Sequence, residues 1–245
     1  MPEATPLVLL HAFPLDAGLW SGVVPALEAD RTVVMPEFPG LGGAPARPGA
    51  SVDGFADDVA ALIAGLPGGR AAVGGLSLGG YAALALAARH PERVGALILS
   101  NTRAEPDTEQ AAAARHASAA AVRAGGYAEF LDGFVPRMVA PGDTAALQAT
   151  RAMADAQDPE AVAVALEALA GRADRRPDLA AMDMPALVIA SSEDVLTPPA
   201  LSEAMVAAMP DARLHVMDGA GHLSALERPA EWADVVRAFL AGLDG

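Results

Sequence analysis

Cysteine is absent from this chain of 245 residues. Its absence excludes disulfide bridges, a thiolate nucleophile and a cysteine-ligated metal, so any catalysis must use oxygen and nitrogen groups. Basic residues are also scarce: 16 Lys and Arg stand against 31 Asp and Glu, which gives a formal net charge of −15. Because the basic residues form no dense stripe, the sequence disfavours nucleic acid as a partner.

Long hydrophobic runs are missing as well. No basic start leads into a long apolar segment, and no apolar stretch approaches the roughly 20 residues that span a bilayer. We therefore expect a cytoplasmic protein with no membrane partner. The length of 245 residues suits one large domain with an insertion, because domains usually hold about 100–200 residues. The sequence does not predict an oligomeric state.

Strand and helix patterns alternate along most of the chain. Strands are predicted over the apolar runs 7–10, 32–35, 71–74, 94–99, 186–190 and 214–217. The apolar residues of 55–66 and 232–240 instead recur on one helical face. This alternation predicts an α/β fold, with a mostly parallel sheet of about six strands flanked by helices. The ligand site of such a sheet lies at the carboxyl ends of its strands.

The strand pattern stops over residues 103–182, which we interpret as an inserted helical cap, or lid. Residues 1–102 and 183–245 would then form the core. Within the cap, residues 109–123 are mostly alanine. Alanine favours helices but has little surface to bury, so we expect this helix to pack shallowly and to permit movement.

Ser77 is the strongest candidate for a nucleophile. It lies in Gly75-Leu76-Ser77-Leu78-Gly79, between the predicted strand 71–74 and an alanine-rich, helix-favouring stretch. A serine on a sharp strand-to-helix turn is exposed, and the two glycines avoid collisions with the neighbouring strand and helix. The helix that follows would direct its N-terminal amides to the same point and favour a developing negative charge.

A serine hydroxyl needs a base to take its proton and a third group to orient that base. Asp194 follows the predicted strand 186–190, and His222 lies on the glycine-flanked loop that follows strand 214–217. Both are therefore expected at the edge of the sheet that also carries Ser77. Asp218 is a rival acid, but it precedes the glycine turn and would more naturally brace it.

Together these motifs resemble the α/β-hydrolase fold superfamily, and in particular its small capped serine esterases and lactonases. The resemblance covers nearly the whole chain and rests on His11-Ala12-Phe13-Pro14-Leu15-Asp16, Glu37-Phe38-Pro39-Gly40-Leu41-Gly42, the Ser77 pentapeptide, Ser192-Glu193-Asp194 and Gly221-His222. It implies that Ser77 is the nucleophile, Asp194 the orienting acid and His222 the general base. It also implies that the amides of Phe13 and Leu78 form the oxyanion hole.

Two features depart from the usual pattern of this family. The first loop usually reads His-Gly, whereas this chain has His11-Ala12, and alanine tolerates fewer backbone conformations than glycine. The geometry of the Phe13 amide is therefore the point to examine. Only residues 1–6 precede the first predicted strand, so we expect the sheet to lack the N-terminal antiparallel hairpin that such enzymes often have.

Substrate contacts are predicted for three further residues. Asn101 and Arg103 follow the predicted strand 94–99 at the entrance to the cap, where they could bind a polar or carboxylate group. Arg103 could equally belong to a surface ion pair. Trp20 could form part of the wall of an acyl pocket, or belong to the core.

The resemblance implies hydrolysis of a small-molecule ester or lactone through an acyl-enzyme, with no metal and no organic cofactor. A serine nucleophile argues against haloalkane dehalogenase and epoxide hydrolase chemistry, which uses a carboxylate nucleophile in this superfamily. Lactone opening, thioester hydrolysis, carbon–carbon bond hydrolysis, perhydrolysis and acyl transfer remain alternatives for the same triad. A noncatalytic binding protein is a further alternative, which ligand binding without turnover would favour.

Overall fold

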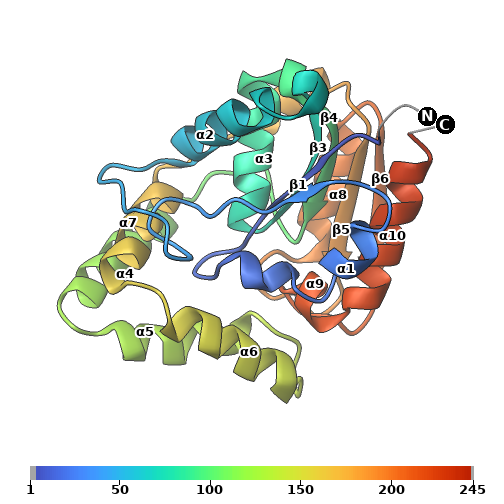
Figure 1. Cartoon of the computed structure of the whole chain (residues 1–245). Coiled ribbons are helices and arrows are strands. Elements are labelled where there is room, and N and C mark those ends of the chain that lie inside the picture. Colours follow the sequence, from blue (N-terminus) through green and yellow to red (C-terminus); the bar gives the residue numbers. More distant parts are fainter. Residues whose placement is uncertain (1–3, 244–245) are drawn as a thin grey trace.

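One parallel sheet organises the molecule, which we describe from a computed structural model over residues 4–243 (Figure 1). Its strands are β1 (Leu7–Leu10), β2 (Val33–Val34), β3 (Ala71–Leu76), β4 (Val94–Ser100), β5 (Ala186–Ser191) and β6 (Ala212–Met217). They are arranged in the order β2-β1-β3-β4-β5-β6, and every neighbouring pair is parallel. The predicted parallel sheet of six strands is confirmed, and its described part contains no antiparallel hairpin.

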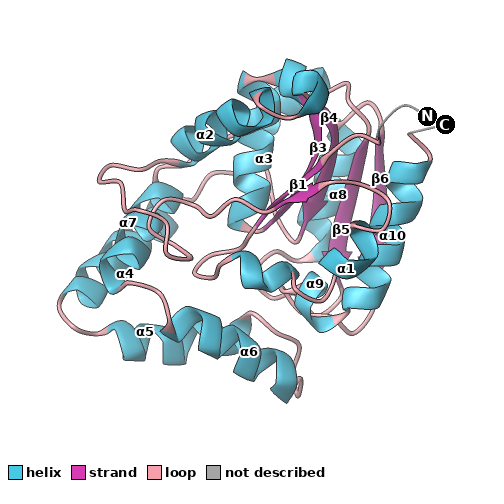
Figure 2. Ribbon diagram, in the orientation of Figure 1, coloured by secondary structure: helices cyan, strands magenta, loops and turns pink. Residues whose placement is uncertain are grey.

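Helices cover both faces of this sheet (Figure 2). They are α1 (Val24–Leu27), α2 (Val52–Ala64), α3 (Leu78–Arg89), α4 (Glu109–Arg123), α5 (Tyr127–Phe134), α6 (Thr144–Asp155), α7 (Pro159–Ala170), α8 (Pro199–Ala208), α9 (Ser224–Glu227) and α10 (Pro229–Ala241). Helices α2, α3 and α8 pack on one face, whereas α1 and α10 pack on the other. No helix within residues 4–243 is long and apolar enough to cross a membrane.

The hydrophobic core is divided by the sheet into two clusters. In β1 the side chains of Val8 and Leu10 join the cluster beneath α2 and α3, and those of Leu7 and Leu9 join the cluster beneath α10. All four are fully buried. Strands of a parallel sheet that is covered on both faces are apolar at every position for this reason. The sequence pattern of β1 is thus explained by its place in the sheet.

Helices α4 to α7 form a separate group between β4 and β5, set apart from the sheet at the lower left of Figure 1. Only Ala119 and Val122 of α4 are buried, so the alanine-rich helix contributes little apolar surface. Helix α7 is more deeply packed, and its Val162, Leu166 and Leu169 are buried. The two helices pack against each other, so α7 forms the firmer side of the pair.

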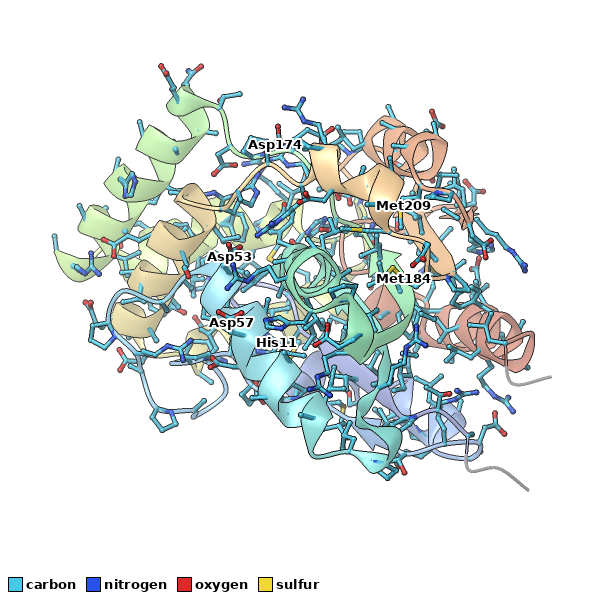
Figure 3. The ribbon with its side chains drawn as sticks, turned by 90° about the horizontal axis from the view of Figure 1, so that it is seen from above. His11, Asp53, Asp57, Asp174, Met184 and Met209 are labelled. Carbon is cyan, nitrogen blue, oxygen red and sulfur yellow. The ribbon has the colours of Figure 1, made fainter. Side chains whose placement is uncertain are left out.

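The group returns to the core through an ion pair between Arg175 and Asp53 of α2. Figure 3 shows Asp53 and Asp57 on that helix. Asp57 receives hydrogen bonds from Arg89 and lies 2.7 Å from His90 Nε2, at the end of α3. Helix α2 therefore connects the helical group to the helix that carries Ser77 at its start.

Candidate active site

Ser77 occupies the turn between β3 and α3. Its backbone has φ 55° and ψ −109°, a conformation that residues other than glycine rarely adopt. Gly75 and Gly79 leave the space that this turn needs: a Cβ on Gly75 would strike the Gly79 carbonyl, and one on Gly79 would strike the Leu10 carbonyl. The turn thus presents the Ser77 side chain at the carboxyl edge of the sheet, as in a nucleophile elbow.

Asp194 and His222 form a buried pair on the loops that follow β5 and β6. His222 Nδ1 lies 2.8 Å from Asp194 Oδ2, and the side chains are 3% and 0% exposed. Burial raises the pKa of Asp194, but the charge of His222 and the hydrogen bonds from His222 and Thr197 outweigh burial and hold that pKa well below its usual range. Asp194 is therefore ionised near neutral pH, and it can fix the tautomer of His222 and stabilise its cation.

The carboxylate of Asp194 is held by neutral donors in addition to His222. Its Oδ1 accepts the backbone amides of Leu196 and Thr197 at 2.8 and 2.9 Å, and its Oδ2 accepts the Thr197 hydroxyl at 2.6 Å. Hydrogen bonds on both oxygens restrict rotation of the carboxylate. The orientation of His222 is restricted in turn.

Asn101 also binds this carboxylate, which differs from the expectation that it would contact substrate. Its Nδ2 donates to Asp194 Oδ2 at 3.0 Å and to Ser191 Oγ at 2.9 Å, and its Oδ1 accepts from Ser224 Oγ at 2.6 Å. The residue is fully buried and has φ 46°. Asparagine tolerates this left-handed conformation better than most residues, and Asn101 does not line the cavity that contains Ser77.

Glu227 braces the loop that carries His222, a role that sequence reasoning missed. Its carboxylate accepts the amides of Gly221 (2.9 Å) and Leu223 (3.1 Å), on either side of the histidine. It also accepts the amide of Ala140 at 2.8 Å, which joins the loop to the segment between α5 and α6. Burial raises the pKa of Glu227 despite these three bonds. No local pattern signals such a contact, because Ala140 and Glu227 lie far apart in the sequence.

The loop after β1 lies beside Ser77 and contains the unusual Ala12. His11 is fully buried, and its Nδ1 lies 3.0 Å from the Ala12 carbonyl, which can only accept. Its Nε2 accepts the amide of Phe38 at 3.2 Å, so the histidine connects two loops. The amide of Leu78 is the first of α3, and the first amides of a helix have no partner within it. The amides of Phe13 and Leu78 remain the predicted oxyanion donors.

A cavity of about 340 Å³ contains Ser77 and His222 in its wall. The other lining residues are Phe13, Tyr81, Arg103, Asp107, Ala111, Ala114, Arg115, Ser118, Phe130, Phe134, Arg137, Leu166, Leu169, Val195, Leu196 and Thr197. Helices α4, α5 and α7 therefore supply much of the wall that faces the nucleophile. The aromatic rings of Phe13 and Phe134 approach with centroids 5.8 Å apart, which makes one side of the cavity apolar.

Of the three predicted substrate contacts, Arg103 lines this cavity and Trp20 does not. Trp20 is fully buried, with its ring centroid 5.2 Å from that of Trp232 on α10. It belongs to the core rather than to an acyl pocket, because the short 3-10 helix that contains it (Ala17–Trp20) packs in the same hydrophobic cluster as α10. Within residues 4–243, no three His, Asp or Glu side chains are grouped closely enough to hold a metal ion.

A second hollow, of about 470 Å³, lies at the opposite edge of the sheet. Its lining includes Pro6, Arg70, Ala72 and Gly95, near the starts of β1, β3 and β4. Ligands of parallel sheets bind at the carboxyl ends of the strands instead. The smaller cavity beside Ser77 is therefore the better candidate for the site of the reaction.

Comparison with known proteins gives the family to which this fold belongs. A family model described as the alpha/beta hydrolase fold matches residues 5–229. The chain is 38% identical to a pimeloyl-[acyl-carrier protein] methyl ester esterase of Aromatoleum aromaticum, over 96% of this chain and 98% of the relative. It is 29% identical to a 3-oxoadipate enol-lactonase of Acinetobacter baylyi, over 99% and 91%. A thermophilic esterase from Thermogutta terrifontis, solved with malate bound, superposes with a TM-score of 0.94 at 32% identity, over 98% and 91%.

Proposed function

This chain belongs to the alpha/beta hydrolase fold family and is an ester hydrolase, and we propose that Ser77, His222 and Asp194 form its catalytic triad. The observation that carries the proposal is the buried 2.8 Å pair of His222 and Asp194 in the cavity that also contains Ser77. A serine, a base and an orienting acid that meet at one cavity are the parts that acyl transfer needs.

The reaction proceeds in two halves. His222 takes the proton of the Ser77 hydroxyl as its oxygen attacks the ester carbonyl, and the amides of Phe13 and Leu78 stabilise the oxyanion that forms. Asp194 stabilises the imidazolium. His222 then gives the proton to the departing alcohol, which leaves an acyl group on Ser77. A water molecule repeats the sequence, with His222 as base again, and releases the carboxylic acid.

The helical group over residues 103–182 acts as the cap of this enzyme and determines which acyl groups fit. Three of its helices line the cavity, so the size and charge of the substrate are set there rather than by the triad. Methyl esters are the first substrates to test, because relatives are named as methyl ester esterases. Lactones are the second class, because another relative is named as an enol-lactonase.

The direct test is turnover of p-nitrophenyl acetate and of simple methyl esters by the wild-type protein and by Ser77→Ala. We expect the wild type to hydrolyse both and the variant to lose activity while keeping its melting temperature. Hydrolysis retained by a folded Ser77→Ala protein would refute the assigned nucleophile. Ligand binding with no turnover of esters or lactones by the wild type would favour a noncatalytic binding protein.

A further inference from the structure

Asp107 lies in the wall of the cavity, in the segment between β4 and α4, and its side chain is fully buried. Three guanidinium groups surround this single carboxylate. Arg103 Nη2 lies 3.2 Å from Oδ1, Arg172 Nη1 lies 2.7 Å from Oδ1, and Arg115 Nε lies 2.6 Å from Oδ2. Three positive charges against one negative leave two in excess.

Two other carboxylates lie near this cluster. Asp53 is paired with another arginine, Arg175, and Glu105 does not balance the charge. It lines a separate void of about 10 Å³ with Arg103 and Arg172 rather than the cavity of Ser77. Its Oε2 is buried and accepts no hydrogen bond from residues 4–243. Even when Glu105 is counted, the cluster keeps a positive charge in a protein whose net charge is −15.

The three arginines differ in which of their hydrogen-bond donors remain available to a ligand. Arg172 is buried, lies 4.5 Å over the ring of Tyr81, and donates to the Leu169 and Glu105 carbonyls. It does not line the cavity of Ser77. Arg172 is therefore a fixed part of the structure that holds Asp107 in place.

Arg103 and Arg115 line the cavity and keep unused donors. The Nε of Arg103 is buried and has no partner among residues 4–243, which is a costly condition for a guanidinium donor. Arg115 binds Asp107 through Nε, and no described residue accepts from its two terminal nitrogens. These two nitrogens form the edge of a guanidinium that matches the two oxygens of a carboxylate.

From this arrangement we propose that Arg103 and Arg115 bind a carboxylate at the far end of the acyl group, so that the preferred substrates are half-esters of dicarboxylic acids. Phe13, Phe134 and Leu166 give the same cavity an apolar side, which suits a methylene chain between the ester and the carboxylate. The inference rests on the proposed function, because it places the ester carbonyl at Ser77.

The test compares monomethyl esters of succinate, glutarate, adipate and pimelate with their neutral counterparts, in which a primary amide replaces the free carboxylate. We expect kcat/KM at the best chain length to be about 10-fold to 100-fold higher for the half-ester, from the worth of a hydrogen bond to a charged group. Equal kcat/KM for acid and amide at every length would overturn the inference.

The variants Arg115→Gln and Arg115→Lys assign the effect to this residue. The ratio of kcat/KM for the half-ester to kcat/KM for the amide should fall to near 1 in Arg115→Gln. It should be partly kept in Arg115→Lys, which retains the positive charge but not the paired donors of the guanidinium. Arg123→Gln is the matched control, because Arg123 lies on the same helix and pairs at the surface with Glu160 and Glu167. An unchanged ratio in a folded Arg115→Gln protein would refute the site.

Calorimetry with the Ser77→Ala protein separates this inference from the proposed function, because it does not need turnover. The half-ester should bind more tightly than the amide to Ser77→Ala, and the difference should vanish in Ser77→Ala with Arg115→Gln. If wild-type protein turns over neutral esters but shows no carboxylate preference in either assay, only the inference fails. If no ester is turned over but the binding difference is present, the proposed function fails, whereas the carboxylate-binding site at Arg103 and Arg115 stands.

Discussion

Asp194 and Asp107 are two buried carboxylates near one cavity, and their partners differ in charge. Asp194 is surrounded by one imidazole and by neutral donors from Asn101, Leu196 and Thr197. Asp107 is surrounded by three guanidinium groups. The neutral donors around Asp194 leave its negative charge available to stabilise a protonated His222. The three guanidinium groups around Asp107 neutralise its negative charge and leave a net positive charge.

These two sites show that the role of a buried aspartate depends on the charges around it. The pKa of both carboxyls is held below its usual range, although burial alone would raise each. A low pKa thus does not distinguish the acid of a triad from a structural ion pair. The sum of the neighbouring charges does distinguish the two, because it determines whether a cation or an anion is stabilised next to the carboxylate.

The largest expected effect comes from Asp194→Asn, which removes the negative charge from the first arrangement. We expect kcat/KM for methyl esters to fall by about 10⁴-fold, because His222 loses its orienting acid and takes the wrong tautomer. Asp218→Asn is the control, since Asp218 is exposed and accepts a hydrogen bond from Ser192. An unaffected Asp194→Asn enzyme would move the role of acid to another residue.

Asp107→Asn breaks the second arrangement and should act on stability. Without the carboxylate, three guanidinium groups lack a counter-charge, and we expect the free energy of unfolding to fall by about 2–4 kcal/mol. Urea denaturation measures this change. Asp58→Asn should have a much smaller effect, because the ion pair of Asp58 with Arg47 is exposed to water. Equal losses in the two variants would show that Asp107 is not a buried counter-ion.

Asn101→Gly tests whether neutral donors hold the acid of the triad. Glycine accepts the left-handed backbone of this position, so the variant removes only the side chain. We expect kcat to fall about 10-fold, from the loss of a hydrogen bond to a charged group, with little change in KM. A rise in KM at constant kcat would instead indicate the substrate contact that the sequence first suggested.

Acid titration of the protein's stability gives the smallest expected effect and tests the lowered pKa of Asp107. A carboxyl whose pKa is lowered by folding stabilises the protein above its unfolded pKa of about 3.9, and this stability is lost as pH falls through the lower folded pKa. Below about pH 4 the free energy of unfolding of Asp107→Asn should therefore decrease less steeply than that of the wild type. Parallel curves would show that Asp107 has an ordinary pKa.

The sequence best predicts the elements that depend on residues close together in the chain. The apolar residues of β1 and the glycines around Ser77 contact their neighbours through the regular geometry of a strand and of a turn. The edge strand β2 is shorter than predicted, because only Val33 and Val34 pair with β1. A strand at the edge has one neighbour to fix its ends.

Asp194 and His222 were predicted because their motifs resemble those of a known family, whereas no motif marks the distant partners of three other residues. Trp20 packs against Trp232, Asn101 bonds to Asp194, and Glu227 bonds to the amide of Ala140. Each contact joins segments that only the sheet order and the inserted helices bring together. The excess of positive charge around Asp107 was missed for the same reason. Arg172 follows α7 and is far in the sequence from Arg103 and Arg115, although the fold brings all three to Asp107.

In the proposed mechanism, Ser77 is a nucleophile that His222 and Asp194 activate. The most direct measurement is mass spectrometry after exposure of the wild type, Ser77→Ala and Asp194→Asn to a fluorophosphonate. From the proposed mechanism we expect one adduct on Ser77 of the wild type, none on Ser77→Ala and much slower labelling of Asp194→Asn. An adduct on another residue, or none on a folded wild-type protein, would contradict it.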